Sequence, residues 1–346
     1  MKAFRLTAPH TAVLEAVPQP SAGPGEVLVR VGAAGACHSD LHILDAPDAL
    51  GMPIPVTLGH ENAGWVEAIG PGVIGFERGE PVAIYGCVGC GTCAPCLAGR
   101  DNQCRRTAPG GIGLSRDGGM TDFVVAPARQ LVPIGDLDVL QAAPLTDAGL
   151  TPYHAINLTR HGLRPDATCV VIGLGGLGHM AVQILSATTA VHIVAVDVRD
   201  QALQLAREAG ARHVIKSDAD TVAHIRDIVA PAVGGVDVVL DFVGSPSTLE
   251  IARAVVAPGG DIAIVGLGGG MLPVGFGSLP FEVRVTVPFW GTKAELAQVI
   301  ALAQAGHIRA HVERFSLADA KVAYDRLRAG KVLGRAVIVP NESGRS

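Results

Sequence analysis

Aromatic and charged residues are both scarce in this 346-residue chain, at 4% and 17% of the sequence. The formal net charge is −5, and the lysines and arginines do not gather into a basic patch. Proteins that bind nucleic acids need such a patch for the phosphates, and those that bind single strands also use aromatic platforms. We therefore expect no nucleic-acid partner.

The first ten residues, MKAFRLTAPH, lack the apolar stretch of a secretory leader, so we expect a cytoplasmic protein. Residues 167–196 carry no formal charge, and a run of this length could cross a bilayer. However, glycines interrupt the front of the run and His192 lies near its end. These interruptions favour a buried strand–turn–helix–strand unit, so we expect no membrane segment.

Four of the seven cysteines lie in one short segment, GCGTCAPCLAGRDNQC: Cys90, Cys93, Cys96 and Cys104. The Gly, Pro, Ala and Asn residues between them favour tight turns. Four thiolates suit the tetrahedral coordination of a structural zinc ion. Disulfides, free core thiols and an iron–sulfur cluster are the alternatives. Because CxxC steps hold the thiols too close for ordinary disulfide loops, we favour zinc and a reducing compartment.

The length of the chain suggests two domains. Gly and Pro punctuate the first part heavily, and short apolar alternations there predict an irregular β-rich domain. The alternations include Val27, Val29 and Val31, then Val82 and Ile84, and the run Phe123–Val125.

From about Leu150 the pattern changes to apolar strands that alternate with helices, which is typical of a doubly wound parallel sheet. Expected strands are Cys169–Ile172, His192–Val196, His213–Ile215, Val236–Asp241 and Asp261–Val265, and expected helices are Leu177–Ala187 and Gln201–Ala209. A helix at Lys293–Ala305 and a last strand at Val337–Val339 then return to the first domain. We predict an α/β protein with one domain at residues 1–148 and 291–346 and the other at residues 149–290.

A GxGxxG pattern follows the first of these strands and precedes the first helix. In this context the pattern predicts a dinucleotide-binding turn, because the glycines permit a tight turn and a close approach to a pyrophosphate at the helix N-terminus. Its residues are Gly173, Gly175, Gly176, Leu177 and Gly178.

Asp197 ends the next strand, where a carboxylate typically binds the adenosine ribose. Such a carboxylate would repel a 2′-phosphate, so we predict NAD as the cofactor rather than NADP. Arg199 lies nearby and would instead favour a 2′-phosphate, which weakens this choice slightly.

Catalytic zinc takes three protein ligands and leaves one position open. Outside the cysteine loop, Cys37 in GACHSD and His60 in LGHE are the first candidates. With these motifs, the four-cysteine loop, the GLGGLG turn and the closing Gly334-Arg335, the sequence resembles the zinc-dependent medium-chain alcohol dehydrogenases over essentially its whole length. It looks most like the bacterial NAD-dependent secondary alcohol dehydrogenases.

The resemblance implies a GroES-like catalytic domain beside a Rossmann domain, with two zinc ions per chain. Many family members have a second cysteine where this chain has Asp147, in PLTDAG. A carboxylate is an acceptable zinc ligand. We therefore expect Cys37, His60 and Asp147 to hold the catalytic zinc. Related polyol dehydrogenases carry Glu there, so a carboxylate leaves the substrate open.

The resemblance also implies roles for several neighbours of these ligands. Ser39 would bond the substrate oxygen, and His42 would end a proton relay through the cofactor ribose. Asp40 would orient His60. Glu61 would either approach the metal or remain a buried, paired carboxylate.

We also assign residues to the cofactor site and to a substrate pocket. His38, Val243, Gly266 and Arg335 are assigned to the cofactor site. Leu50, Met52, Phe281 and Trp290 are assigned to the pocket, although these apolar side chains could equally belong to the core.

Together these features predict reversible oxidation of an alcohol, expected to be secondary, with hydride transfer to NAD. The expected partners are a small-molecule alcohol or ketone and further copies of the chain in a dimer or tetramer. The alternatives are a polyol dehydrogenase, a zinc-free or non-catalytic relative, and a nucleic-acid-binding zinc protein.

Overall fold

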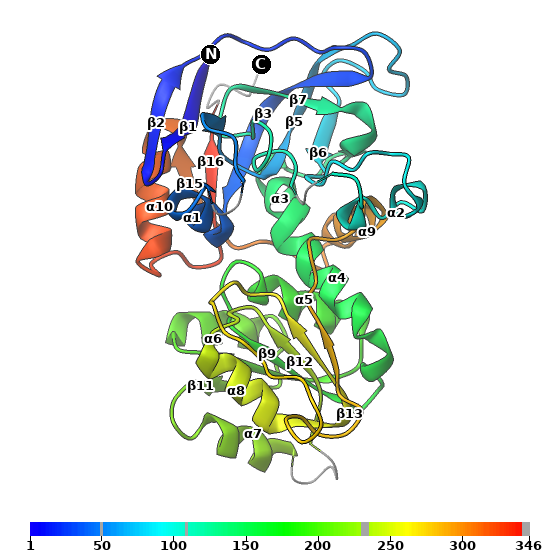
Figure 1. Cartoon of the computed structure of the whole chain (residues 1–346), viewed down its shortest axis with the longest axis vertical. Helices are drawn as coiled ribbons and strands as arrows, with labels where there is room; N and C mark the ends of the chain where they lie inside the picture. Colours follow the sequence, from blue (N-terminus) through cyan, green and yellow to red (C-terminus); the bar gives the residue numbers. More distant parts are fainter. Residues whose placement is uncertain (49–50, 108–109, 230–234, 341–346) are drawn as a thin grey trace. The chain divides into compact units, whose positions relative to one another are not determined.

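The computed structural model describes the chain except residues 49–50, 108–109, 230–234 and 341–346. It divides into two compact units, each with its own elements (Figure 1). Unit 1 comprises Met1–Leu150, Thr292–Ala305 and Ala310–Ser346. Unit 2 comprises Thr151–Gly291 and Gly306–Arg309.

Unit 1 is built on two sheets. A seven-stranded sheet has the order β15-β16-β3-β5-β6-β8, with β7 paired to β3, and a three-stranded sheet has the order β2-β1-β4. The strands are β1 Lys2–Ala8, β2 Thr11–Ala16, β3 Glu26–Ala36, β4 Val56–Thr57, β5 Glu61–Ile69, β6 Pro81–Ile84, β7 Phe123–Pro127, β8 Leu131–Pro133, β15 Val312–Ser316 and β16 Arg335–Val339. The alternating valines of β3 are buried in the core of this unit, in agreement with the predicted strand.

The helices of unit 1 come from both ends of the sequence. They are α1 His38–Asp45, α2 Ala94–Leu97, α3 Val139–Pro144, α9 Lys293–Gln304 and α10 Ala320–Arg328. α9 begins at a capping box, in which the Thr292 hydroxyl accepts the Glu295 N–H and the Glu295 carboxylate accepts the Thr292 N–H. α10 packs against α1, so the last part of the chain contacts the segment that follows Cys37.

A π-helical turn over Leu145–Gly149 follows α3 directly. Pro144, at the end of α3, has no N–H to donate, and the Thr146 hydroxyl donates to the Ala143 carbonyl (2.8 Å). Such turns are rare in proteins, and those that occur frequently lie at functional sites. Asp147 lies within this turn.

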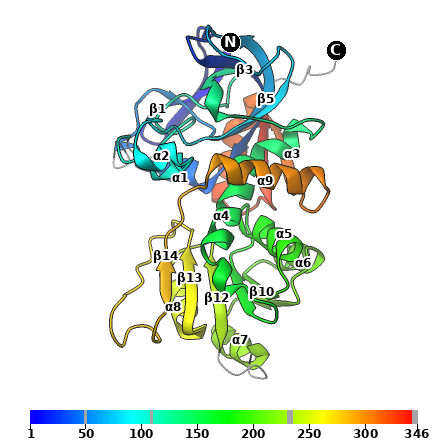
Figure 2. The same cartoon turned by 90° about the vertical axis from the view of Figure 1, so that its right-hand side faces the viewer.

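Unit 2 contains a six-stranded sheet in the order β11-β10-β9-β12-β13-β14, and every pairing is parallel. In chain order this is 3-2-1-4-5-6, the doubly wound arrangement of dinucleotide-binding folds. The strands are β9 Thr168–Ile172, β10 His192–Asp197, β11 His213–Lys216, β12 Val236–Asp241, β13 Val256–Ile264 and β14 Arg284–Thr286. Figure 2 shows β13 and β14 side by side at one end of the sheet.

Four of the helices described in unit 2 cover the sheet in two pairs, α5 beside α6 and α7 beside α8. Because crossovers between parallel strands are right-handed and the order reverses at β9, the two pairs lie on opposite faces. The helices are α4 Leu150–Leu158, α5 Gly178–Thr188, α6 Asp200–Glu208, α7 Thr221–Val229 and α8 Pro246–Val255.

The predicted fold class is confirmed, and β12 has the predicted bounds. Helices α7 and α8 and the short edge strand β14 were not predicted, and β13 begins earlier than predicted, at Val256. The charge-free run forms β9, the glycine turn, α5 and β10. Within the described residues, none of the helices has the length and apolar character needed to cross a bilayer.

Candidate functional site

Four metal-binding side chains meet in unit 1: Cys37, His60, Glu61 and Asp147. One ligand atom from each lies within 4.8 Å of those of the others. Asp147 Oδ2 is 3.8 Å from Cys37 Sγ and 3.5 Å from His60 Nε2. Cys37, His60 and Glu61 are buried, whereas Asp147 retains partial exposure. We call these four residues the mixed cluster.

Three separate segments place the mixed cluster. Cys37 is the N-cap of α1 and follows β3 directly. His60 precedes β5 and Glu61 begins it, and β5 pairs with β3 so that Gly35 faces Glu61. Any side chain at Gly35 would collide with the Glu61 carboxylate. Asp147 comes from the π-helical turn, so the four donors meet only in the folded chain.

His60 is oriented by the buried carboxylate of Asp40. Its Nδ1 bonds Asp40 Oδ1 at 2.9 Å, which leaves Nε2 facing Asp147. Burial lowers the pKa of His60, but the charge of Asp40 and hydrogen bonds with Asp147, Asp40 and Cys37 raise it well above its usual range. Surroundings that attract a proton so strongly also favour a metal cation.

Arg335 lies against the mixed cluster and is itself buried. Its Nε donates to Glu61 at 2.8 Å, a second nitrogen pairs with the other Glu61 oxygen, and the same nitrogen is 3.3 Å from Asp147 Oδ2. Burial raises the pKa of Glu61 to about 7, although Arg335 opposes this shift. The bidentate pairing engages both oxygens of Glu61, whereas Cys37, His60 and Asp147 have no bidentate pairing of this kind among the described contacts.

Helix α1 carries the other residues predicted near the mixed cluster. The Ser39 hydroxyl is 3.6 Å from Cys37 Sγ. His42 is exposed and lies three residues later, so it is a neighbour of Ser39 on the helix surface. His38 is exposed at the start of the helix, one turn from His42.

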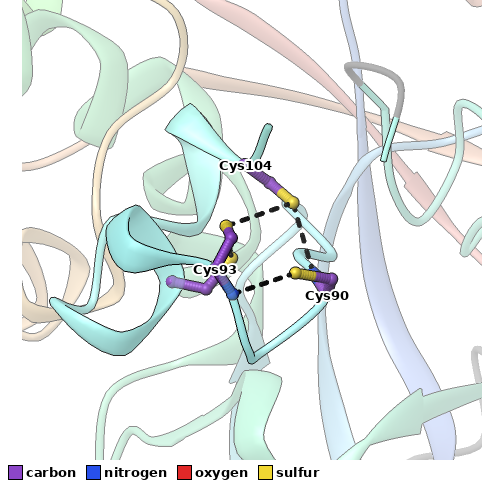
Figure 3. A group of neighbouring side chains, drawn as sticks. Cys90, Cys93 and Cys104 are labelled. Atoms are coloured by element: carbon purple, nitrogen blue, oxygen red, sulfur yellow. Dashed lines mark hydrogen bonds between the residues drawn. The ribbon is translucent and has the colours of Figure 1, made fainter. Parts of the chain in front are cut away.

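The four cysteines of the loop form a second group in unit 1. Figure 3 shows three of them, Cys90, Cys93 and Cys104, beside one another. Their sulfurs all lie within 4.8 Å of one another, and Cys93 Sγ is 3.4 Å from Cys96 Sγ and 3.9 Å from Cys104 Sγ. These separations are too long for a disulfide, and all four cysteines are free. A tetrahedral zinc with Zn–S bonds of about 2.3 Å needs sulfurs about 3.8 Å apart, so the group fits one metal ion.

Backbone N–H groups point at the sulfurs of this loop. Cys90 Sγ accepts from the N–H groups of Thr92 and Cys93, and Cys104 Sγ accepts from Cys90 and Arg106. Bonds from the backbone and side chain of Thr92 lower the pKa of Cys90 to about 7, and a bond from the Thr107 side chain is the main cause that lowers the pKa of Cys104 to about 5. The thiolates of Cys90 and Cys104, the form that binds metal, are therefore stabilised, whereas desolvation raises the pKa of Cys96.

Unit 2 contains the predicted glycine turn between β9 and α5. Gly173 has φ +83°, where a side chain would be strained and would meet Val243. A Cβ at Gly178 would collide with the Gly173 carbonyl, so the helix start and the strand end approach closely. Leu177 is the N-cap of α5, and a Cβ at Gly175 would meet the Arg199 guanidinium at 3.9 Å, an ordinary van der Waals contact.

Asp197 ends β10 and ties the glycine turn to it. Its Oδ2 accepts the Leu174 N–H at 2.7 Å, and its Oδ1 accepts the Arg199 N–H at 2.9 Å and Arg199 Nε at 3.2 Å. The Arg199 guanidinium is thus paired with the carboxylate. Val243 and Gly266 follow the neighbouring strands β12 and β13 and are in close contact.

The predicted pocket residues belong to both units, Met52 to unit 1 and Phe281 and Trp290 to unit 2. Leu50 lies outside the described residues, and Met52 packs against the core of unit 1. The Phe281 carbonyl accepts the Gly259 N–H near the amino ends of β13 and β14. The glycine turn lies at the opposite, carboxyl ends of the strands of this sheet. Trp290 is buried, contacts Phe289 edge-on (5.9 Å) and has φ +53°, which is unusual for a bulky residue.

Comparisons with known proteins give matches in both the first and the later part of the chain. The profile of the alcohol dehydrogenase GroES-like domain matches residues 23–136, and that of the zinc-binding dehydrogenases matches residues 176–305. An NAD-dependent alcohol dehydrogenase of Sulfurisphaera tokodaii is 37% identical over 94% of this chain and 96% of its own length. The chain belongs to the zinc-dependent medium-chain alcohol dehydrogenase family.

Two solved structures of the family resemble the chain as a whole. The alcohol dehydrogenase of Aeropyrum pernix is 36% identical with a TM-score of 0.91, covering 98% of this chain and all of the other. Acetophenone reductase of Geotrichum candidum, solved in complex with NAD, is 33% identical with a TM-score of 0.87, covering 99% and 98%. The predicted family is therefore confirmed.

Two features of this family member were not predicted. Tyr324 of α10 donates to Asp40 Oδ2 at 2.9 Å, and Arg335 donates to Glu61 and Asp147, whereas its role at the cofactor stays a prediction. No motif marks Tyr324, which is 284 residues from Asp40. Tyrosine is rare in this sequence, and a buried tyrosine needs a hydrogen-bond partner for its hydroxyl. Each tyrosine was therefore a candidate for such a bond, and this was the available signal.

Proposed function

We propose that this protein is an NAD-dependent alcohol dehydrogenase that oxidises a secondary alcohol reversibly to a ketone. The observation that carries the proposal is the mixed cluster, in which Cys37, His60 and Asp147 converge while Arg335 engages Glu61. Three converging donors with one position left over are the arrangement of catalytic zinc sites. The name of the related acetophenone reductase denotes a ketone substrate, and this supports a secondary alcohol.

We propose two zinc ions per chain. The four cysteines suit a closed structural site, and Cys37, His60 and Asp147 suit an open catalytic one. Cys37 and Asp147 together supply two negative charges, which balance the charge of Zn²⁺, and Arg335 balances Glu61. When bound, the catalytic zinc is a Lewis acid toward the alcohol oxygen, and NAD accepts the hydride.

The residues on α1 then handle the proton. The Ser39 hydroxyl, close to the Cys37 sulfur, would accept the proton of the substrate alcohol and give up its own proton, which the relay would carry to His42. His42, one turn along the helix and exposed, passes a proton to water. Asp40 holds His60 in the orientation that turns Nε2 toward the other ligands.

We propose that the glycine turn of unit 2 binds the pyrophosphate of NAD at the start of α5, with Gly173, Gly175, Gly176, Leu177 and Gly178 around it. Asp197 binds the adenosine ribose, and its charge disfavours a 2′-phosphate. The pairing of Arg199 with Asp197 supports this choice, because the guanidinium is already engaged. In unit 2 we also propose Val243 and Gly266 as cofactor-binding residues, and in unit 1 we propose His38 and Arg335. Unit 1 is the catalytic domain and unit 2 the nucleotide domain.

We further propose a homo-oligomer in the cytoplasm. Free thiols in the cysteine loop suit a reducing compartment. Large apolar side chains between β13 and the end of unit 2 are strongly exposed, with Met271 at 88% and Phe276 at 97%. β14 ends the sheet, so its outer edge is available for pairing with a second copy.

Replacement of Asp147 tests the proposed function. Asp147→Asn removes a charged ligand and should lower kcat/KM for secondary alcohols on the order of 10²-fold or more, with loss of one zinc ion per chain. Asp138→Asn is the matched control, because Asn also caps the start of α3. Full zinc content and full activity in Asp147→Asn would overturn the assignment.

The same assays separate the alternatives. The unmodified protein should reduce NAD⁺ with secondary alcohols at higher kcat/KM than with polyols or primary alcohols. A preference for polyols would instead indicate a polyol dehydrogenase, and active protein without zinc would indicate a zinc-free relative.

A further inference from the structure

The side chain of Tyr324 reaches the surroundings of the mixed cluster from the C-terminal part of the chain. Tyr324 lies on α10 and is buried. Its ring stacks on Phe4 of β1, with centroids 6.0 Å apart and an interplanar angle of 20°. Its hydroxyl donates to Asp40 Oδ2 at 2.9 Å and lies 3.3 Å from the sulfur of Met120. The ring is thus held by apolar contacts while the hydroxyl points at a single carboxylate.

Asp40 accepts three donors from three parts of unit 1. Oδ2 accepts the Cys37 N–H at 2.9 Å and the Tyr324 hydroxyl, and Oδ1 bonds His60 Nδ1. Asp40 is fully buried, so water does not compete for these bonds. A carboxylate held on both oxygens cannot rotate freely, and its orientation fixes the plane of the imidazole.

We propose that Tyr324 is a positioning residue for the catalytic metal, which acts through Asp40 to keep His60 Nε2 aimed at the site of the ion. The inference rests on the proposed function of the mixed cluster. Burial and the charge of Asp40 raise the pKa of Tyr324 well above its usual range. The hydroxyl therefore stays protonated and remains a donor.

The test is Tyr324→Phe in the full-length, zinc-loaded protein. The variant keeps the ring and its stacking on Phe4 but removes the hydroxyl. Transfer of zinc to an excess of a coloured chelator is followed with time, and the Cys37→Ser variant identifies which phase belongs to the mixed cluster. Outer partners of metal ligands typically change affinity about 10- to 100-fold, and Tyr324 is one bond further out, so we expect release from the mixed cluster to be about 3- to 10-fold faster.

Release from the four-cysteine loop is the internal control and should not change. Phe4→Leu is the matched variant, because it removes the ring contact and leaves the hydroxyl. It should lower the Tm without faster release of zinc from the mixed cluster. In an Asp40→Ala background, Tyr324→Phe should change the release rate less than twofold, because the bond that transmits its effect is already absent.

Two results would overturn the inference in distinguishable ways. If Tyr324→Phe lowers the Tm but leaves both release phases unchanged, Tyr324 has only a packing role and the proposed function stands. If the unmodified protein and Cys37→Ser release the same amount of zinc, the mixed cluster holds no metal, and both the inference and the proposed function fail.

Discussion

The two groups of metal-binding side chains in unit 1 differ in how the chain assembles them. The four cysteines lie within residues 90–104, and two of them are partly exposed. The mixed cluster draws on residues 37, 60–61 and 147, is largely buried and contacts a second layer formed by Asp40 and Arg335. One group is local and chemically uniform, and the other is non-local and mixed.

The difference indicates different tasks. Four thiolates fill a tetrahedron and leave no position for a substrate, so such a site stabilises its loop. In the mixed cluster, Glu61 is paired with Arg335, and the three other donors match the number of protein ligands that catalytic zinc sites use. We expect changes in the first group to alter stability and changes in the second to alter catalysis.

The largest expected effect comes from Cys37→Ser. Loss of the catalytic zinc should reduce kcat/KM on the order of 10³-fold or more, because a Lewis acid contributes several kcal/mol and about 1.4 kcal/mol is tenfold in rate. The Tm should change little. Alcohol oxidation and thermal unfolding are measured on the same preparation.

The paired variant is Cys93→Ser in the four-cysteine loop. It should lower the Tm by roughly 5–10 °C through loss of several kcal/mol of metal binding, and the protein that remains folded should keep most of its kcat. The contrast between the groups fails if Cys93→Ser loses activity while fully folded, or if Cys37→Ser keeps it.

A smaller effect is expected at His42, since only an open site needs a path for protons. His42→Ala should slow alcohol oxidation about 10- to 100-fold, because general base help is worth about 10²–10⁴ and water can replace part of it. Added imidazole should restore part of the rate, and zinc content should stay constant. An unchanged pH profile of kcat without rescue would leave His42 as a surface residue.

The smallest effect is expected in unit 2, where we propose the cofactor site rather than a metal site. Asp197→Ala should raise the KM for NAD and should raise kcat/KM with NADP by about tenfold, because it removes a negative charge and releases Arg199. Adding Arg199→Ala should cancel the gain with NADP. Equal kcat/KM for both cofactors in the unmodified enzyme would contradict the role of Asp197.

The fold was predictable where local pattern and tertiary packing agree. The apolar strands β9, β10 and β12 stand between clear turn signals, so their bounds were predicted within about a residue. β14 has only three residues, with partly exposed side chains, so the sequence carries little sign of a strand there. Its strand conformation depends on pairing with β13. The π-helical turn was also missed, because hydrophobic periodicity carries no signal for a single widened turn.

The site was predictable from motifs but not from geometry. Cys37, His60 and the four cysteines lie in short patterns, and Asp147 was located by resemblance to a position that carries cysteine elsewhere. The ion pair of Arg335 with Glu61 joins residues 274 apart, and the bond of Tyr324 joins residues 284 apart. Spacing along one sequence cannot reveal such contacts, because they depend on how β16 and α10 pack.

The most direct test of two metal sites with different tasks is the zinc content of active, untreated protein and of the two cysteine variants. We predict two zinc ions per chain in the unmodified protein. Cys37→Ser should retain one zinc and its fold without activity, and Cys93→Ser should retain one zinc and activity with a lower Tm. One zinc ion or none in the active, unmodified protein would contradict the account.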